Sequence, residues 1–257
     1  MITFTFPEND VGELLLQEEL EISEKDFRIQ RSKTQEQGKE EGDISLLLTR
    51  KNRVAVRKPK SENLVAYLLE QKQDISPHIE KDIKAGYDFF HVAIICSFLP
   101  DPTCKFTWAR LTVKMQFAPK EDDLLVQGKP LVCDLFPIEI NSEVRMQRTF
   151  KISGGLSYEF IEFKPESETK SEFIIYQPEI FAVGREGSTF SWDFKESVQK
   201  SIYGDKVLFA IIKKPKDSQV VGQFEIDAQV KIKEGFIGIP PFVKRKKDAV
   251  NILYEIC

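Results

Sequence analysis

The chain has 257 residues, enough for one large domain or two ordinary ones and for a core that needs no metal or disulfide. Its 37 basic and 41 acidic side chains give a formal net charge of -4, which argues against a general polyanion-binding protein, because such proteins carry a clear basic excess. Phenylalanine is frequent, with 20 residues against 3 methionines, and this bias favours strands over helices. We therefore expect a mainly β protein that does not bind nucleic acids broadly.

The first 60 residues are typical of short strands joined by polar connections. Ile2, Phe4 and Phe6 alternate with threonines, which is the period of a half-buried strand. The segments 44–51 and 52–58 predict two further strands. The run 31–43, which precedes both segments, has no apolar residue and predicts an exposed loop.

Two helices are predicted between residues 61 and 86. In the first, Ser61 is placed as the cap. Its apolar face would be formed by Leu64, Val65, Leu68 and Leu69. The second helix is bracketed by Ser76 as the cap, Pro77 in the first turn and Gly86 at the end, with an apolar stripe at Ile79 and Ile83. We expect residues 1–86 to form an amino-terminal α+β portion and residues 87–257 an antiparallel β-sandwich or open barrel.

The part after residue 87 consists of predicted strands. The clearest is 219–233, where an apolar face alternates with a polar face over the whole segment. The segment 206–214 is apolar on both faces and suits a central strand, and the polar, proline-containing turn 214–219 predicts a hairpin between the two. The pair Gly154-Gly155 predicts another hairpin.

The segment 89–115 combines a histidine, two cysteines and a tryptophan. Alternation from Phe90 to Phe98 places Cys96 on a core face and His91 on the opposite face. The connection 99–104 has two prolines and predicts a hairpin loop before the next strand. In that strand, a bulge between Trp108 and Leu111 would bring Phe106 and Trp108 to the core. The segment therefore predicts a strand, a loop and a strand.

Catalytic and metal-binding interpretations of this segment have little support. His91 and Cys96 differ in parity, so they cannot converge on one metal ion with Cys104. A cysteine nucleophile needs a base, but the only histidines are His78 and His91, and neither lies beside a cysteine. We expect no cofactor and no metal, and reduced cysteines at all four positions: Cys96, Cys104, Cys133 and Cys257.

Three other clusters have both a functional and a structural interpretation. The carboxylates Asp134, Glu139 and Glu143 could serve acid/base chemistry or hold a divalent ion, but we interpret them as surface charges. Trp192, between two phenylalanines, is interpreted as a core residue rather than a stacking patch for a ligand. The basic run 244–247 is interpreted as a solvated turn rather than a nucleic-acid or lipid site.

By elimination, binding is a better interpretation than catalysis. We expect a soluble, cytoplasmic protein, because the sequence shows neither an export signal nor a run of ~20 apolar residues. The expected function is that of a non-enzymatic interaction or regulatory subunit that binds a protein partner. The alternatives are a membrane-acting pore former, with 219–233 as an example of the strands it would need, and a hydrolase that uses Asp134, Glu139 and Glu143.

Overall fold

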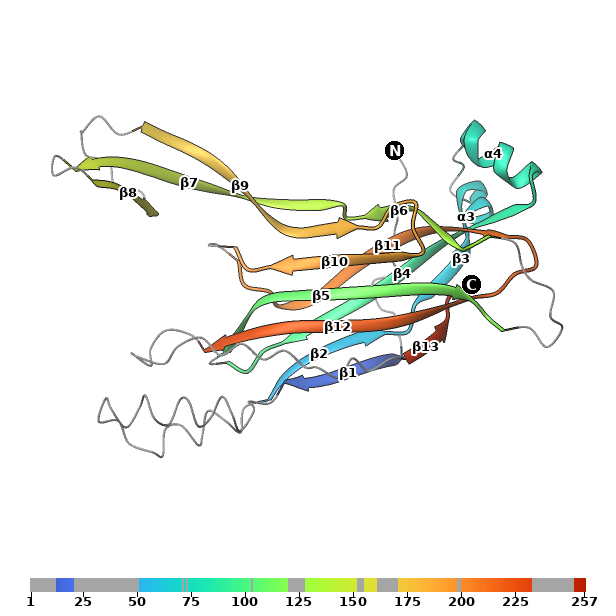
Figure 1. Ribbon diagram of the computed structural model, residues 1–257, viewed down its shortest axis with the longest axis horizontal. Coiled ribbons are helices and arrows are strands. Elements are labelled where there is room, and N and C mark those ends of the chain that lie inside the picture. Colours follow the sequence, from blue (N-terminus) through green and yellow to red (C-terminus); the bar gives the residue numbers. More distant parts are fainter. Residues whose placement is uncertain are drawn as a thin grey trace.

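A computed structural model describes residues 13–20, 51–119 except 71, 73 and 103, 128–151, 155–160, 171–197, 200–232 and 252–257. For 142–151, 155–160, 171–178, 232, 252 and 253 it describes the backbone alone. In the described residues the chain forms two antiparallel sheets that pack face to face, with two short helices at one end (Figure 1). The predicted β-sandwich is therefore confirmed. The predicted strands at 2–6 and 44–50 and the predicted loop at 31–43 lie outside the described residues.

The first sheet, sheet A, has the strand order β1-β2-β4-β11-β6, and β3 pairs with a separate part of β4. Its strands are β1 (Leu14–Leu20), β2 (Asn52–Arg57), β3 (Lys60–Asn63), β4 (Tyr87–Leu99), β6 (Leu131–Phe136) and β11 (Gly204–Pro215). Strand β11 lies between β4 and β6, as its apolar residues on both faces predicted. Three strands that precede residue 87 thus share a sheet with later strands.

The second sheet, sheet B, has the order β13-β12-β5-β10-β9-β7-β8. Its strands are β5 (Cys104–Phe117), β7 (Glu139–Lys151), β8 (Gly155–Phe160), β9 (Ser171–Val183), β10 (Thr189–Lys195), β12 (Val220–Ile232) and β13 (Ile252–Glu255). The hairpin predicted at Gly154-Gly155 is confirmed, because β7 pairs with β8 up to the pair of Lys151 and Gly155.

Two predicted hairpins are wrong. The turn 214–219 connects β11 of sheet A to β12 of sheet B, and the proline-rich connection 99–104 connects β4 of sheet A to β5 of sheet B. Proline and polar residues indicate that the chain reverses, but a reversal can lead to the facing sheet as well as to the neighbouring strand. In both places the chain passes across the sandwich.

The core lies between the two sheets and is made by alternate residues of long strands. In β12 every second residue from Val220 to Val230 is buried, as predicted. Cys96 and Phe98 of β4 are fully buried on the facing sheet. The bulge in β5 was predicted between Trp108 and Leu111 but occurs earlier, between Phe106 and Trp108. Phe106 therefore enters the core as predicted, whereas the core position predicted for Trp108 is wrong, because Trp108 stays partly exposed.

Helices α3 (Leu64–Glu70) and α4 (Pro77–Lys84) follow β3. The predicted cap Ser61 is wrong, because Ser61 belongs to β3 and the side chain of Asn63 accepts hydrogen bonds from the first amides of α3. Leu69 was expected on the apolar face but is exposed, and Tyr67 is buried instead. In α4 the cap Ser76 is confirmed, and its hydroxyl accepts a hydrogen bond from the amide of Ile79.

The turn between β9 and β10 closes one edge of sheet A. The amide of Val132 in β6 donates to the carbonyl of Gly187, and the amide of Glu186 donates to the carbonyl of Val132. Gly184, at the start of this turn, has a φ of +112°, and a Cβ there would lie 2.3 Å from the carbonyl oxygen of Thr189. The turn therefore requires glycine at this position.

Strand β12 provides a stability test of the sandwich. The side chain of Phe224 is fully buried, so Phe224→Ala should lower the free energy of unfolding by about 3 to 5 kcal/mol through lost burial and the cavity left behind. Glu225 on the opposite face of the same strand is the matched control, and Glu225→Ala should lower it by less than about 1 kcal/mol. Chemical denaturation measures both, and equally large losses would contradict a strand with one buried face.

Candidate functional site

The histidine and cysteines of 89–115 do not form one site. Cys96 points into the main core, whereas His91 lies on the outer face of sheet A beneath α3, as their parity predicted. Burial raises the pKa of the Cys96 thiol, which keeps it protonated and unreactive. Cys104 is also buried, and its sulfur is a thiol rather than part of a disulfide. Among the described residues, no group of three acidic, histidine or cysteine side chains is placed to hold a metal ion.

The three carboxylates considered for hydrolysis lie on strands of two different sheets. Asp134 lies on β6 of sheet A and makes an exposed ion pair with Arg185, whose Nε donates to the carboxylate at 2.9 Å. Glu139 lies on β7 of sheet B. Glu143 is on β7 as well, within the part where only the backbone is described. Asp134 is thus an ion-paired residue of one sheet, while the other two belong to the second sheet.

Trp192 is a core residue. Its side chain is fully buried, its ring packs edge-on against Phe190 at 5.3 Å, and its Nε1 donates to the carbonyl oxygen of Pro137 at 3.2 Å. Pro137 lies where the chain passes from β6 of sheet A to β7 of sheet B. The structural interpretation of the tryptophan is therefore confirmed, and Trp192 fixes a crossing between the layers.

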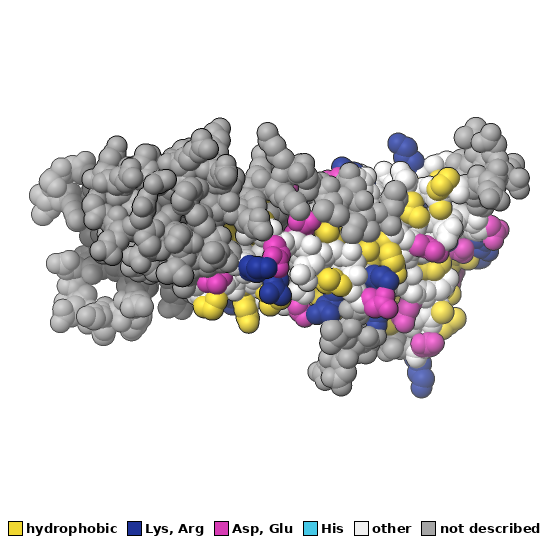
Figure 2. Space-filling view, turned by 90° about the horizontal axis from the view of Figure 1, so that it is seen from below, with side chains coloured by type: hydrophobic (Ala, Val, Ile, Leu, Met, Phe, Trp, Pro, Cys, Tyr) yellow, Lys and Arg dark blue, Asp and Glu magenta, His cyan; other side chains and the backbone are white. Residues whose placement is uncertain are grey.

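The described surface offers no single-sign electrostatic face in the view from below the sandwich. Basic and acidic side chains are intermixed there (Figure 2). The outer face of sheet B shows the same arrangement, with Arg110 bound to Asp193 by two hydrogen bonds and Lys114 bound to Glu225 at 2.7 Å. The basic run 244–247 lies outside the described residues.

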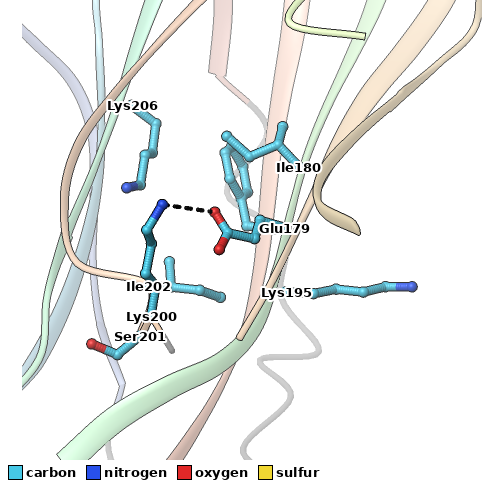
Figure 3. Close-up of a pocket in the computed structure, with 8 residues that line it drawn as sticks. Glu179, Ile180, Lys195, Lys200, Ser201, Ile202 and Lys206 are labelled. Carbon is cyan, nitrogen blue, oxygen red and sulfur yellow. Dashed lines mark ion pairs between the residues drawn. The ribbon is translucent and has the colours of Figure 1, made fainter. Parts of the chain in front are cut away.

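A small pocket lies where β9 and β10 meet the segment before β11. It has a volume of about 60 Å³ and contains the carboxylate of Glu179, which accepts a hydrogen bond from Ser197 at 2.9 Å and lies 3.8 Å from the ammonium of Lys200. Figure 3 shows Lys206 reaching toward the same group, whereas Lys195 points away. No motif in the sequence marks Glu179, because its partners come from distant residues.

The end of sheet B extends past the rest of the sandwich. Strand β10 pairs with β9 only over the last four residues of β9, 180–183. In the described part of the chain, residues 141–151, 155–160 and 171–178 therefore pair only with one another. We call these residues the arm. The arm projects from one end of the molecule, and the two helices lie at the other end (Figure 1).

Exposed apolar side chains surround the start of the arm. Ile138 directly precedes β7 and Ile140 is its second residue, while Phe181 and Val183 lie at the end of β9. All four are exposed, by 39% to 49%. We call these four residues the arm base. Phe136 at the end of β6 is also exposed, by 56%.

The arm base is apolar on both faces of sheet B. Ile140 pairs with Ile180, which is buried in the core, while Phe181 pairs with Asp193 on the outer face. Adjacent residues of a strand point to opposite faces, so Ile140 and Phe181 are exposed on opposite sides. Sequence alternation could not reveal this surface, because the exposure of Ile140 depends on where the facing sheet ends and that of Phe181 on what covers the outer face of sheet B.

No helix in the described residues is both long enough and apolar enough to cross a membrane. No known family model matches the sequence, and no curated protein matches it. Among solved structures, the chain is similar to one described as "Pore forming protein", with 11% identity over 84% of this chain and 92% of that chain and a TM-score of 0.30. A similarity of this degree carries no argument about function.

The burial of the cysteines predicts their order of reaction. A thiol reagent at pH 8 should modify Cys133, which is exposed, well before Cys96 and Cys104, which should react only on unfolding. Mass spectrometry of partly modified protein gives the order. Modification of Cys96 as fast as Cys133, or release of one zinc per chain, would contradict a structural role for the buried thiols.

The ion pair of Asp134 predicts a small effect on stability. Both partners are about half exposed, so Asp134→Ala should change the free energy of unfolding by less than about 1 kcal/mol. Asp193→Ala is the comparison, because Asp193 is buried and holds Arg110 by two bonds, and its loss should cost about 1 to 3 kcal/mol. Denaturation curves give both values, and a loss above 2 kcal/mol at Asp134 would refute its interpretation as a surface charge.

Proposed function

We propose that this protein is a non-enzymatic interaction module, a regulatory subunit of a cytoplasmic assembly, that binds a protein partner through the arm base. The observation that carries the proposal is the exposure of Ile138, Ile140, Phe181 and Val183 in one short region. Single exposed apolar residues are common on protein surfaces, but a group of them at one location is typical of an interface. The cytoplasmic location is supported by the four cysteines, which show no disulfide framework in their spacing.

The position of the arm base favours a partner that covers both faces of the sheet. A strand that is apolar on both sides is normally found between two layers. Sheet A covers Ile180 of β9, which is buried. The edge strand of sheet A is β6, and the exposed residues Ile138 and Ile140 lie beyond this edge. A partner with an apolar groove or strand would complete the missing layer.

Catalysis by the acidic cluster receives less support. A hydrolase needs two carboxylates that converge in a cleft with different proton affinities. Asp134 is on sheet A and is neutralised by Arg185, while Glu139 is on sheet B opposite Phe181. The pocket around Glu179 contains a single carboxylate, which is paired with Lys200.

Pore formation is the second candidate, and the arm is the observation that favours it. Strands that cross a membrane as part of a barrel need about 9 to 11 residues of alternating apolar and polar type. Both β7 and β9 have 13 residues. In the sequence of β7, one parity carries four apolar residues interrupted by Ser142 and Arg148, and the other parity is polar: the apolar residues are Ile140, Val144, Met146 and Phe150. Strand β12 is a poorer example than the sequence suggested, because its apolar face is already packed in the core.

Capture of partners by variants of the arm base tests the proposal. The double variant Ile138→Ser/Phe181→Ser should reduce recovery of a specific partner from native lysate by at least about tenfold, because the apolar contacts dominate such interfaces. Leu69→Ser is the matched control, since Leu69 is exposed by 63% on α3 at the other end of the molecule. Quantitative mass spectrometry after affinity capture measures recovery, and denaturation curves show that each variant is folded.

Two outcomes would refute binding through the arm base. One is a partner recovered equally by the wild-type protein, the double variant and the Leu69 control. The other is dye release from liposomes by the wild-type protein at low concentration in the absence of any partner, which would make pore formation the better account.

A further inference from the structure

We propose that helices α3 and α4 form an acid-sensitive cover on the outer face of sheet A, with His91 as the group whose protonation loosens it. This inference goes beyond the binding proposal and does not depend on which partner the arm base binds. It rests on three features of the helical end of the molecule: an aromatic row, a separate apolar cluster and a small number of polar links.

The aromatic row crosses sheet A beneath α3. The ring of His91 on β4 lies between the ring of Tyr67 on α3, 5.3 Å away between centroids, and the ring of Phe209 on β11, 5.1 Å away and nearly parallel. The row continues from Phe209 to Phe136 at 6.3 Å, where it reaches solvent. His91 itself is only 6% exposed, so a proton on its ring would place a charge between two aromatic rings and away from water.

The cover is held by its own small cluster rather than by the main core. Leu64, Tyr67 and Leu68 of α3 pack on Phe89 of β4, on the opposite side of sheet A from the core between the sheets. Helix α4 has no fully buried residue. Each helix has only two turns or so, and such helices depend on tertiary packing for their stability.

Burial is the cause that lowers the pKa of His91, and none of the charged side chains described around it offsets this effect. Glu62 of β3 is its register partner but is exposed, and Lys60 lies opposite Ala93 on the same strand pair. From β11, Lys213 is bound to Asp82 of α4 at 2.6 Å and lies 4.2 Å from the ring of Tyr87.

Further titratable groups lie on this side of sheet A. Cys133 of β6 is near Lys213 and Asp82, and partial burial raises the pKa of its thiol. Asp134 of β6, which is opposite Ile211, is bound to Arg185. Thus the acidic groups nearby are either exposed or already paired with a base.

Burial lowers the pKa of His91 from its ordinary value of 6.5 to about 4. A histidine whose pKa is lower in the closed state contributes its full stabilisation above about pH 6.5, and this stabilisation falls as the pH drops from there toward 4. If the open cover exposes the ring to water, the ratio of open to closed forms at pH 5.5 should be about tenfold that at pH 7.5. Most exposed carboxylates remain ionised at pH 5.5, so the change reports the histidine.

Opening would expose a continuous apolar surface. With α3 displaced, Phe89, His91 and Phe209 would join Phe136 in one exposed row across sheet A. A fall from pH 7.5 to pH 5.5 would therefore raise the ratio of molecules with this row exposed about tenfold without unfolding the sandwich.

Hydrogen exchange on the full-length protein tests the cover. We expect the protection factors of residues 64–84, corrected for intrinsic rates, to fall about tenfold between pH 7.5 and pH 5.5 in the wild-type protein, while those of β12 stay unchanged. His91→Phe keeps an aromatic ring that cannot take up a proton, so its 64–84 segment should keep its protection at both values. If this variant fails to fold, His91→Gln carries the same expectation.

The second histidine provides the matched control. His78 is exposed on α4, and His78→Gln should retain the tenfold response of the wild-type protein. The proposal is overturned if the wild-type protein shows no change, if the His91 variant responds as the wild-type protein does, or if 64–84 and β12 lose protection together. The first two results would remove His91 as the sensor, and the third would show global rather than local opening.

Discussion

The contact of Phe98 with Phe106 and Phe194 is the interaction on which the two-layer arrangement depends. Phe98 comes from β4 of sheet A, and its ring meets those of Phe106 in β5 and Phe194 in β10 edge-on, at 5.5 and 5.0 Å. All three rings are almost fully buried. Because β4 and β5 are consecutive in the chain but lie in opposite sheets, side-chain packing rather than backbone hydrogen bonding joins them. The arm begins where this packing between the layers ends.

Local patterns predicted the type and burial of the elements well where one face is buried. The alternation of β12 and the cap, proline and glycine of α4 correspond closely to the structure. Sheet membership was not predictable in the same way. The turns at 99–104 and 214–219 are specified by residues within them. The partner of the next strand depends instead on residues far away in the chain, as in the pairing of β12 with β5.

The exposed surfaces were the least predictable part. Ile140 and Phe181 have the sequence surroundings of ordinary core residues. Ile140 is exposed because sheet A stops at β6, whereas Phe181 is exposed on the outer face of sheet B. His91 could be assigned to the outer face by parity, but its burial requires Tyr67, which the helical pattern had not placed on the packed side of α3. Residues whose surroundings come from distant segments require the tertiary structure.

The turn between β9 and β10 replaces a strand at the edge of β6. Its hydrogen bonds to Val132 use backbone groups that would otherwise be open to pairing with another chain, which protects this edge from strand-by-strand aggregation. The protection depends on the length of the turn and on Gly184, whose neighbouring backbone leaves no room for a Cβ. Loops at the ends of sandwiches usually tolerate added residues. The turn between β9 and β10 is an unsuitable place for an epitope tag or an inserted domain. A longer turn would move Gly187 away from β6 and leave the backbone groups of this edge strand open to pairing with another chain.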